Sequence, residues 1–163
     1  MKNKLLLTFL LSIFTLTAHA QFEKNKWFVN SSITSLGLSY SGDEKTSFGF
    51  DAEAGSFMTD NIALLINLGG NYGKHITNHT HIGVGGRYYF DRIGIFLGLG
   101  LKYKRFGQES THRNDLGAAF EVGYAFFLSR TVTLEPAVYY DQSFLHHKNF
   151  SKIGLKLGFG FYF

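Results

Sequence analysis

The sequence predicts an all-β protein, an eight-stranded antiparallel up-and-down transmembrane β-barrel. Three observations predict it. Apolar and polar residues alternate with a period of two through most of the chain. The breaks between these segments alternate between tight turns and longer polar stretches, as in membrane barrels. Charges and glycines share one face of the expected strands, while the other face is almost wholly apolar.

The chain begins with the three regions of a secretory signal peptide. A basic start at Met1–Lys4 precedes an apolar run from Leu5 to about Leu16, and Ala18-His19-Ala20 forms a small-x-small cleavage pattern. The apolar run is too short to span a bilayer as a helix. We therefore expect a cleaved leader at 1–20 and a single barrel domain at 21–163, with a buried N-terminal helix as the alternative.

The composition excludes several classes of protein. Removing 1–20 lowers the formal charge from +4 to +2, because Lys2 and Lys4 leave and 14 basic residues then face 12 acidic ones. Such a small surplus gives no reason to expect nucleic-acid binding. The chain has no cysteine, so it can form no disulfide and carry no lipid-modified cysteine.

The strands follow from the alternation. It is clearest from Ile93 to Lys104 and from Ile153 to Phe163. We expect strands at 27–40, 46–58, 62–72, 80–90, 93–106, 116–128, 131–143 and 151–163. Tight turns are expected at 59–61, 91–92 and 129–130, and longer polar connections at 41–45, 73–79, 107–115 and 144–150. An even strand number places both ends of the barrel on the short-turn, periplasmic side.

The two faces of the strands decide between a membrane barrel and a soluble one. The glycine-rich face carries the charges, and the opposite face is aliphatic and aromatic, for example Leu64, Ile66, Val84 and Val122. An apolar face this broad would cause aggregation in water but suits lipid, whereas a narrow interior favours small residues. A secreted soluble barrel is the alternative.

Aromatic residues near the strand ends predict interfacial girdles. One girdle is expected toward the longer connections and one toward the turns. The expected members are Tyr40, Tyr72, Tyr103 and Tyr140 for the first, and Phe57, Tyr88, Phe90, Phe126 and Phe161 for the second.

The chain ends on alternating glycine and aromatic residues that close on Phe163. This ending, with Gly158, Phe161 and Phe163, resembles the C-terminal assembly signal of bacterial outer-membrane barrels, although Leu157 stands where a polar residue is usual. The mature chain resembles the small outer-membrane barrels that include the OmpA membrane domain and OmpX. Thr59-Asp60-Asn61 and Leu134-Glu135-Pro136 resemble such proteins of Bacteroidetes. The resemblance implies the bacterial outer membrane as location and the barrel-assembly machinery as a partner during biogenesis.

Inward-facing charges are the first candidate site. Unpaired charges in a narrow barrel are costly, so we expect interlocking ion pairs that fill the interior and fix the strand register. A narrow or gated pore is the alternative. The expected network comprises Asp51, Glu53, Arg87, Lys102, Glu121, Glu135 and Lys156, with Lys104 and Asp141 nearby.

Histidines are the second candidate site, because clustered imidazoles can bind metal or respond to acid. Six lie in or beside the longer connections, where they would form an external rim. Their spacing matches no metal-binding motif, so solvated loop histidines are the simpler interpretation and no metal site is predicted. The six are His75, His79, His81, His112, His146 and His147.

Catalysis is the third possibility, because some small outer-membrane barrels modify lipid A with a histidine, a serine and an acid. Ser143, Asp141 and His146 or His147 form a superficially similar group, but Lys148 stands where the deacylase pattern has serine. We therefore predict no catalytic residues and no cofactor.

These observations favour a non-enzymatic integral outer-membrane protein with a role in the envelope or in surface interaction. Its expected partners are outer-membrane lipid and lipopolysaccharide, it is expected to be a monomer, and no nucleic acid is involved. A lipid A-modifying or small-ligand-binding barrel that acts at the rim histidines, and a minor pore, remain the alternatives.

Overall fold

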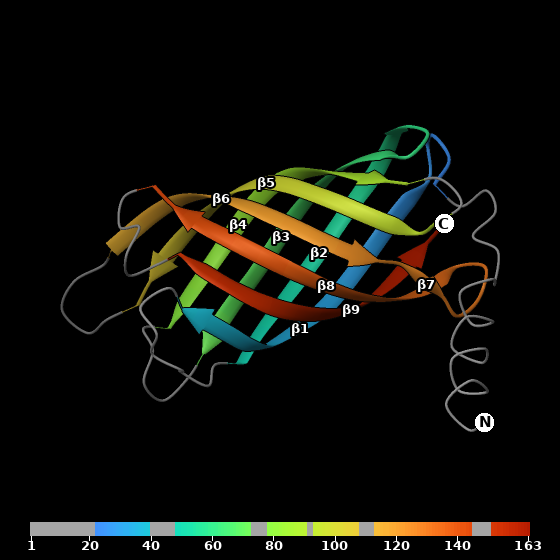
Figure 1. Ribbon diagram of the computed structural model, residues 1–163. Coiled ribbons are helices and arrows are strands. Elements are labelled where there is room, and N and C mark those ends of the chain that lie inside the picture. The colour runs from blue at the N-terminus through green and yellow to red at the C-terminus, as the bar shows by residue number, and fades with distance from the viewer. Residues whose placement is uncertain (1–21, 40–47, 73–77, 91–92, 108–112, 145–150) are drawn as a thin grey trace, which may run out of the picture.

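The computed structural model describes residues 22–39, 48–72, 78–90, 93–107, 113–144 and 151–163, without the side chains of 35–39 and 113. These residues form one closed antiparallel barrel of eight strands, one of them interrupted (Figure 1). The predicted fold class is therefore confirmed. Within the described part of the chain, no helix is both long and apolar enough to cross a membrane.

The strands agree with the expected ranges to within a few residues. The largest difference is β6, which begins three residues earlier than predicted. The bounds are β1 (Trp27–Ser39), β2 (Phe48–Thr59), β3 (Ile62–Tyr72), β4 (His79–Tyr89), β5 (Ile95–Phe106), β6 (Arg113–Tyr124), β7 (Phe126–Phe127), β8 (Val132–Ser143) and β9 (Lys152–Tyr162).

Each strand pairs with its neighbours in sequence, and β1 pairs with β9 to close the barrel. At this seam the backbones of Trp27 and Phe163 exchange hydrogen bonds of 2.7 and 2.9 Å. The turn between β2 and β3 lies at the same end of the barrel, because the N–H of Asn61 donates to the carbonyl of Phe22 just before β1. The start of β1, the end of β9 and this short turn thus share one end, called here the short-turn end (Figure 1). The other end is the loop end.

The segments β6 and β7 are one strand with a local gap at Ala125. Both pair with β8 in a single continuous register, Gly123 with Ala137 and Phe126 with Leu134. This register places Tyr124, the residue before the gap, opposite Pro136, which has no N–H to donate to a neighbouring strand. The only proline of the chain therefore explains why the ladder is interrupted there.

The barrel is apolar outside and polar inside. Outward side chains of the middle of each strand are aliphatic or aromatic and strongly exposed, as at Val84 (57%) and Leu99 (60%). Inward side chains include buried charged and amide groups such as Arg87, Glu135 and Asn30. This is the reverse of a soluble barrel, in which the apolar residues line the interior.

The prediction that Phe57 belongs to the outer girdle is wrong. Its side chain is 1% exposed and points into the barrel, because it shares the inward face of β2 with Asp51 and Glu53. Other expected girdle residues are exposed on the outside, namely Tyr72, Tyr88, Phe90, Tyr103 and Phe161, whereas Phe126 and Tyr140 are half-buried. Tyr40 lies outside the described residues.

Candidate functional site: the barrel interior

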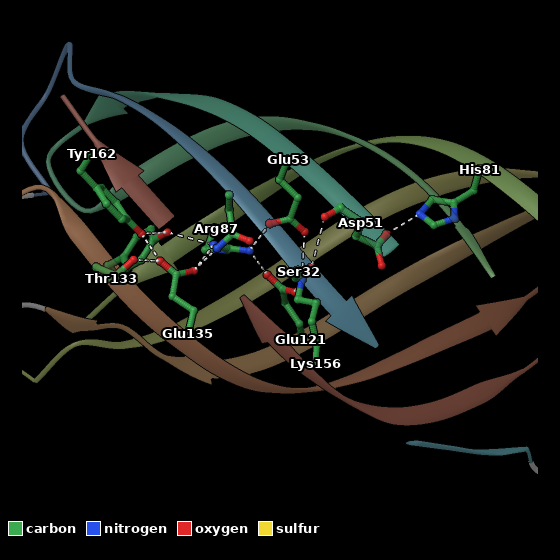
Figure 2. Close-up of polar contacts among 12 residues, drawn as sticks. Ser32, Asp51, Glu53, His81, Arg87, Glu121, Thr133, Glu135, Lys156 and Tyr162 are labelled. Carbon is green, nitrogen blue, oxygen red and sulfur yellow. Dashed lines mark hydrogen bonds and ion pairs between the residues drawn. The ribbon is translucent and has the colours of Figure 1, made fainter. Parts of the chain in front are cut away.

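Arg87 is the centre of the interior network. It projects from β4, is 1% exposed, and donates to carboxylates from three other strands (Figure 2). Its Nη2 lies 2.6 Å from Glu53 Oε2 of β2 and also contacts Glu121 of β6, while its Nη1 lies 3.1 Å from Glu135 Oε2 of β8. One guanidinium thereby ties together strands from opposite sides of the barrel, which a planar fork of five donors allows.

Lys156 of β9 is the second cation of this group. Its Nζ lies 2.9 Å from Glu53 Oε1 and also contacts Glu121. Glu53 and Glu121 therefore each bridge Arg87 and Lys156 with their two oxygens. Such a bridged arrangement compensates buried charges far better than isolated pairs do.

Glu135 connects the network to the barrel seam. Its Oε1 accepts hydrogen bonds of 2.7 Å from Thr133 and from Tyr162, and its Oε2 accepts one of 2.8 Å from Asn30. Because Asn30 is on β1 and Tyr162 on β9, this one carboxylate links the two strands that close the barrel. Figure 2 shows Glu135 beside Tyr162.

Glycines on the inward face make room for these side chains. A Cβ atom on Gly98 would collide with the side chain of Glu121, and one on Gly158 would lie 2.7 Å from the side-chain oxygen of Asn30. The side chains of the network thus lie across neighbouring strands at positions that have no side chain of their own. The glycines of the charged face are therefore part of the packing of the network.

A second set of polar contacts lies nearer the loop end. Asp141 of β8 accepts from Lys102 at 3.1 Å and from Lys104 at 3.0 Å. Asp51 lies 2.7 Å from Nε2 of His81, which points inward from β4. All seven residues expected in the interior network therefore make buried or half-buried polar contacts inside the barrel, and His81, which was expected at the rim, contacts Asp51 there.

An aromatic cluster fills the short-turn end. Phe22, which precedes β1, is 5% exposed; its ring stacks on Tyr89 with centroids 4.1 Å apart. It also contacts Phe57 and Tyr162, with centroids 5.9 Å away in each case. The segment that carries it is held by hydrogen bonds from the N–H of Asn61 to the Phe22 carbonyl and from the N–H of Lys24 to Asp60.

The rim histidines are only partly described. His79 is half-buried at the start of β4, with its ring 5.1 Å from Phe106 and 6.1 Å from His81. His75, His112, His146 and His147 lie outside the described residues. In the part of the chain that the structure covers, no three histidine, cysteine, aspartate or glutamate side chains are grouped so that they could hold a metal ion.

The serine and the acid of the possible catalytic group have other partners. Ser143 is 1% exposed and donates to Asp115 Oδ1 at 2.9 Å, and Asp141 is paired with Lys102 and Lys104. The histidines of that group lie outside the described residues. The described contacts thus place Ser143 and Asp141 in the interior packing.

The residues expected to form the assembly signal lie on β9 and just after it. Gly158 faces the interior beside Asn30, whereas Phe161 and Phe163 are exposed on the outside. The alternation in this segment thus separates small inward residues from large outward ones. The predicted leader at 1–20 lies outside the described residues.

Sequence reasoning missed several interior residues. Asn30, Thr133 and Tyr162 complete the partners of Glu135 but are uncharged, so a search for charges does not find them. Their position on the inward face of strands was a usable signal. Phe22 precedes the first strand, where no alternation marks it.

No family model matches this sequence, and no curated protein matches it. Solved structures do match. The N-terminal barrel domain of OprF from Pseudomonas aeruginosa has a TM-score of 0.67 at 14% identity, over 86% of this chain and 98% of that one. Neisserial surface protein A matches with a TM-score of 0.65 at 15% identity, over 83% of this chain and 96% of that one. Ail, the attachment invasion locus protein of Yersinia pestis, solved in complex with the heparin analogue sucrose octasulfate, matches with a TM-score of 0.53 at 14% identity. This match covers 86% of this chain and 99% of that one. The chain therefore has the fold of the small eight-stranded barrels of the bacterial outer membrane.

Proposed function

We propose that this protein is an integral outer-membrane barrel with a structural or surface-interaction role, and that it is neither an enzyme nor an open pore. The observation that carries the proposal is the pairing of an apolar exterior with an interior filled by side chains. The exterior suits contact with hydrocarbon. The interior is crossed by the Arg87 network and, at the short-turn end, by the aromatic cluster around Phe22.

The apolar exterior supports membrane insertion because of its extent. Outward residues of every long strand contribute, among them Ile33, Phe50, Ile66, Val84 and Leu101. All backbone groups of the spanning segments can pair within a closed barrel, which is the condition for β-structure in lipid. A water-soluble protein would rarely expose an apolar belt this large.

The filled interior supports a role other than conduction. Eight strands leave an interior that side chains can fill. Here Glu53, Glu121 and Glu135 from three strands converge on Arg87, so the charges of the interior are engaged with one another. Ser143 and Asp141, the serine and the acid considered for catalysis, contact Asp115 and the two lysines Lys102 and Lys104 instead.

The first test is insertion followed by conductance. The mature chain is refolded into liposomes, and the same sample is run unheated and heated on a gel, because a folded barrel migrates differently from the unfolded chain. We expect a heat-dependent shift and no conductance steps in a planar bilayer into which insertion has been verified. A soluble protein without a shift would refute the membrane barrel, and regular conductance steps would make it a pore.

The second test addresses chemistry on lipid. Lipid A from outer membranes with and without the expressed protein is compared by mass spectrometry. We expect identical species. A new lipid A species that disappears when His146 and His147 are both changed to alanine would make the protein a lipid A-modifying enzyme.

A further inference from the structure

The outward-facing strand positions are uncharged at all but one of the described positions. Among those whose side chains the structure describes, Arg105 of β5 alone carries a charged group. It is exposed and lies two residues from the outward-facing Tyr103, at the loop end of the strand. An exposed guanidinium at the border of an otherwise apolar exterior is placed where it can contact a charged group of the surrounding lipid.

The neighbours of Arg105 are polar and uncharged. In the strand register it pairs with Thr80 of β4 on one side and with Asn114 of β6 on the other, and both are exposed. Side chains directly opposite one another on paired strands lie about 5 Å apart. A hydroxyl, a guanidinium and a carboxamide thus form a short polar row around the barrel.

This polar row marks the boundary of the apolar exterior. Two residues nearer the middle of the barrel, the next outward row consists of Ile82, Tyr103 and Leu116, which are 55%, 45% and 45% exposed. Two residues correspond to roughly 7 Å along a strand. The change from apolar to hydrogen-bonding side chains is therefore completed within a distance typical of a lipid headgroup region.

No carboxylate of the described residues pairs with Arg105. Asp115, which follows Asn114 on β6, points inward and accepts a hydrogen bond from Ser143 at 2.9 Å. Asp141, the acid of the loop-end half of β8, is bound to Lys102 and Lys104. The guanidinium is therefore presented outward, where the lipid lies if the barrel spans the membrane.

We propose that Arg105, with Thr80 and Asn114, binds the phosphate of a lipid A molecule in the outer leaflet. The inference rests on the membrane location proposed above, which places the loop end outside. A guanidinium matches phosphate with two parallel hydrogen bonds, and the hydroxyl and the carboxamide add donors for the remaining oxygens. A phosphomonoester carries more negative charge than the diester of a phospholipid, so the single cation favours the glycolipid.

The test is native mass spectrometry of the refolded barrel in detergent with added bisphosphorylated lipid A. Arg105→Gln should lower the bound fraction by about tenfold or more, since charge-assisted hydrogen bonds to phosphate are lost. Arg105→Lys should retain part of the binding, because the charge stays but the bidentate geometry is lost. The matched control is Arg130→Gln, an exposed arginine at the short-turn end, which should bind as the unaltered protein does.

Two further lipids identify the ligand. Lipid A without phosphate should bind no better to the unaltered protein than to Arg105→Gln, and phosphatidylglycerol should bind more weakly than lipid A. Equal binding of lipid A to the unaltered protein and to Arg105→Gln would overturn the proposal. Phosphatidylglycerol binding as tight as lipid A through Arg105 would overturn the assignment to the glycolipid.

The gel assay separates this proposal from the proposed function. An unaltered protein that neither shifts on heating nor enters liposomes would refute the membrane barrel and this site with it. A shifted, inserted barrel whose lipid binding does not depend on Arg105 would refute the lipid site alone.

Discussion

Replacing Arg87 with methionine should destabilise the barrel strongly. Methionine keeps much of the length of the side chain but removes the charge and the donors. In the native barrel two cations, Arg87 and Lys156, face the three carboxylates of Glu53, Glu121 and Glu135. After the change one cation faces all three.

The size of the loss follows from this count. Removing one partner of a buried ion pair costs about 3 to 5 kcal/mol, because the remaining charge has lost its compensation. The hydrogen bonds that Asn30, Thr133 and Tyr162 donate to Glu135 remain, so Glu135 keeps partial compensation. We therefore expect the free energy of unfolding to fall by about 3 kcal/mol, the lower end of that range.

The assay is urea-induced unfolding of the protein refolded in liposomes. The only tryptophan, Trp27, is 58% exposed on the outer face at the start of β1, so its emission reports on lipid contact. Arg130→Met is the matched control, since Arg130 is exposed outside the network. That change should alter the free energy of unfolding by no more than about 0.5 kcal/mol.

A compensating variant makes the reasoning refutable. Combining Arg87→Met with Glu53→Gln and Glu121→Gln leaves one cation, Lys156, and one carboxylate, Glu135. Because one cation then faces one carboxylate and no longer three, this triple variant should recover at least half of the loss, and the non-additivity can be read from the cycle of single and combined changes. A loss below about 1 kcal/mol for Arg87→Met, or a triple variant less stable than the single one, would show that charge compensation does not hold the interior together.

Three further changes test other parts of the barrel. Phe22→Ala should lower the local free energy of unfolding by up to about 3 kcal/mol and speed amide hydrogen exchange at the short-turn end, because a buried ring is removed from a terminal segment. Unchanged exchange rates at that end would contradict a packed role for Phe22. Gly98→Val should prevent refolding, judged by loss of the heat-dependent gel shift, because its side chain would meet Glu121, whereas Gly86→Ala, with no atom nearer than 3.6 Å to the added carbon, should refold normally. Leu99→Lys in the middle of the outer face should lower stability in liposomes by about 2 to 4 kcal/mol, and an unchanged urea midpoint would argue against lipid contact there.

Strand positions and faces were predictable because both depend on local alternation. The strands differ from the expected ranges by a few residues, and the inward charges lie where the period of two places them. The error at Phe57 arose because its position near a strand end was weighed above its parity. Phe57 is separated from Asp51 and Glu53 by even numbers of residues, so parity alone predicts an inward side chain.

The partners of the inward charges could not be predicted. Arg87 on β4 meets Glu135 on β8 across the barrel, and that meeting depends on the stagger between strands accumulated around the closed sheet. The pattern of one strand carries no information on this stagger. Phe22 was missed for a related reason, because it enters the cluster from outside the strands and contacts Tyr89 of β4 and Phe57 of β2 only once the barrel has closed.

The distribution of polar groups bears on where a function of this barrel would reside. A path along the axis would have to separate Arg87 from its carboxylates and also displace Phe22 from the aromatic cluster, so two unrelated sets of contacts would have to break together. Interactions at the outer surface require neither change. The one outward charge of the described strands, Arg105, is engaged by none of the described carboxylates and lies at the loop end. We therefore expect changes at the outer surface of the loop end to alter what the protein binds while leaving its stability intact, and changes in the interior to do the reverse.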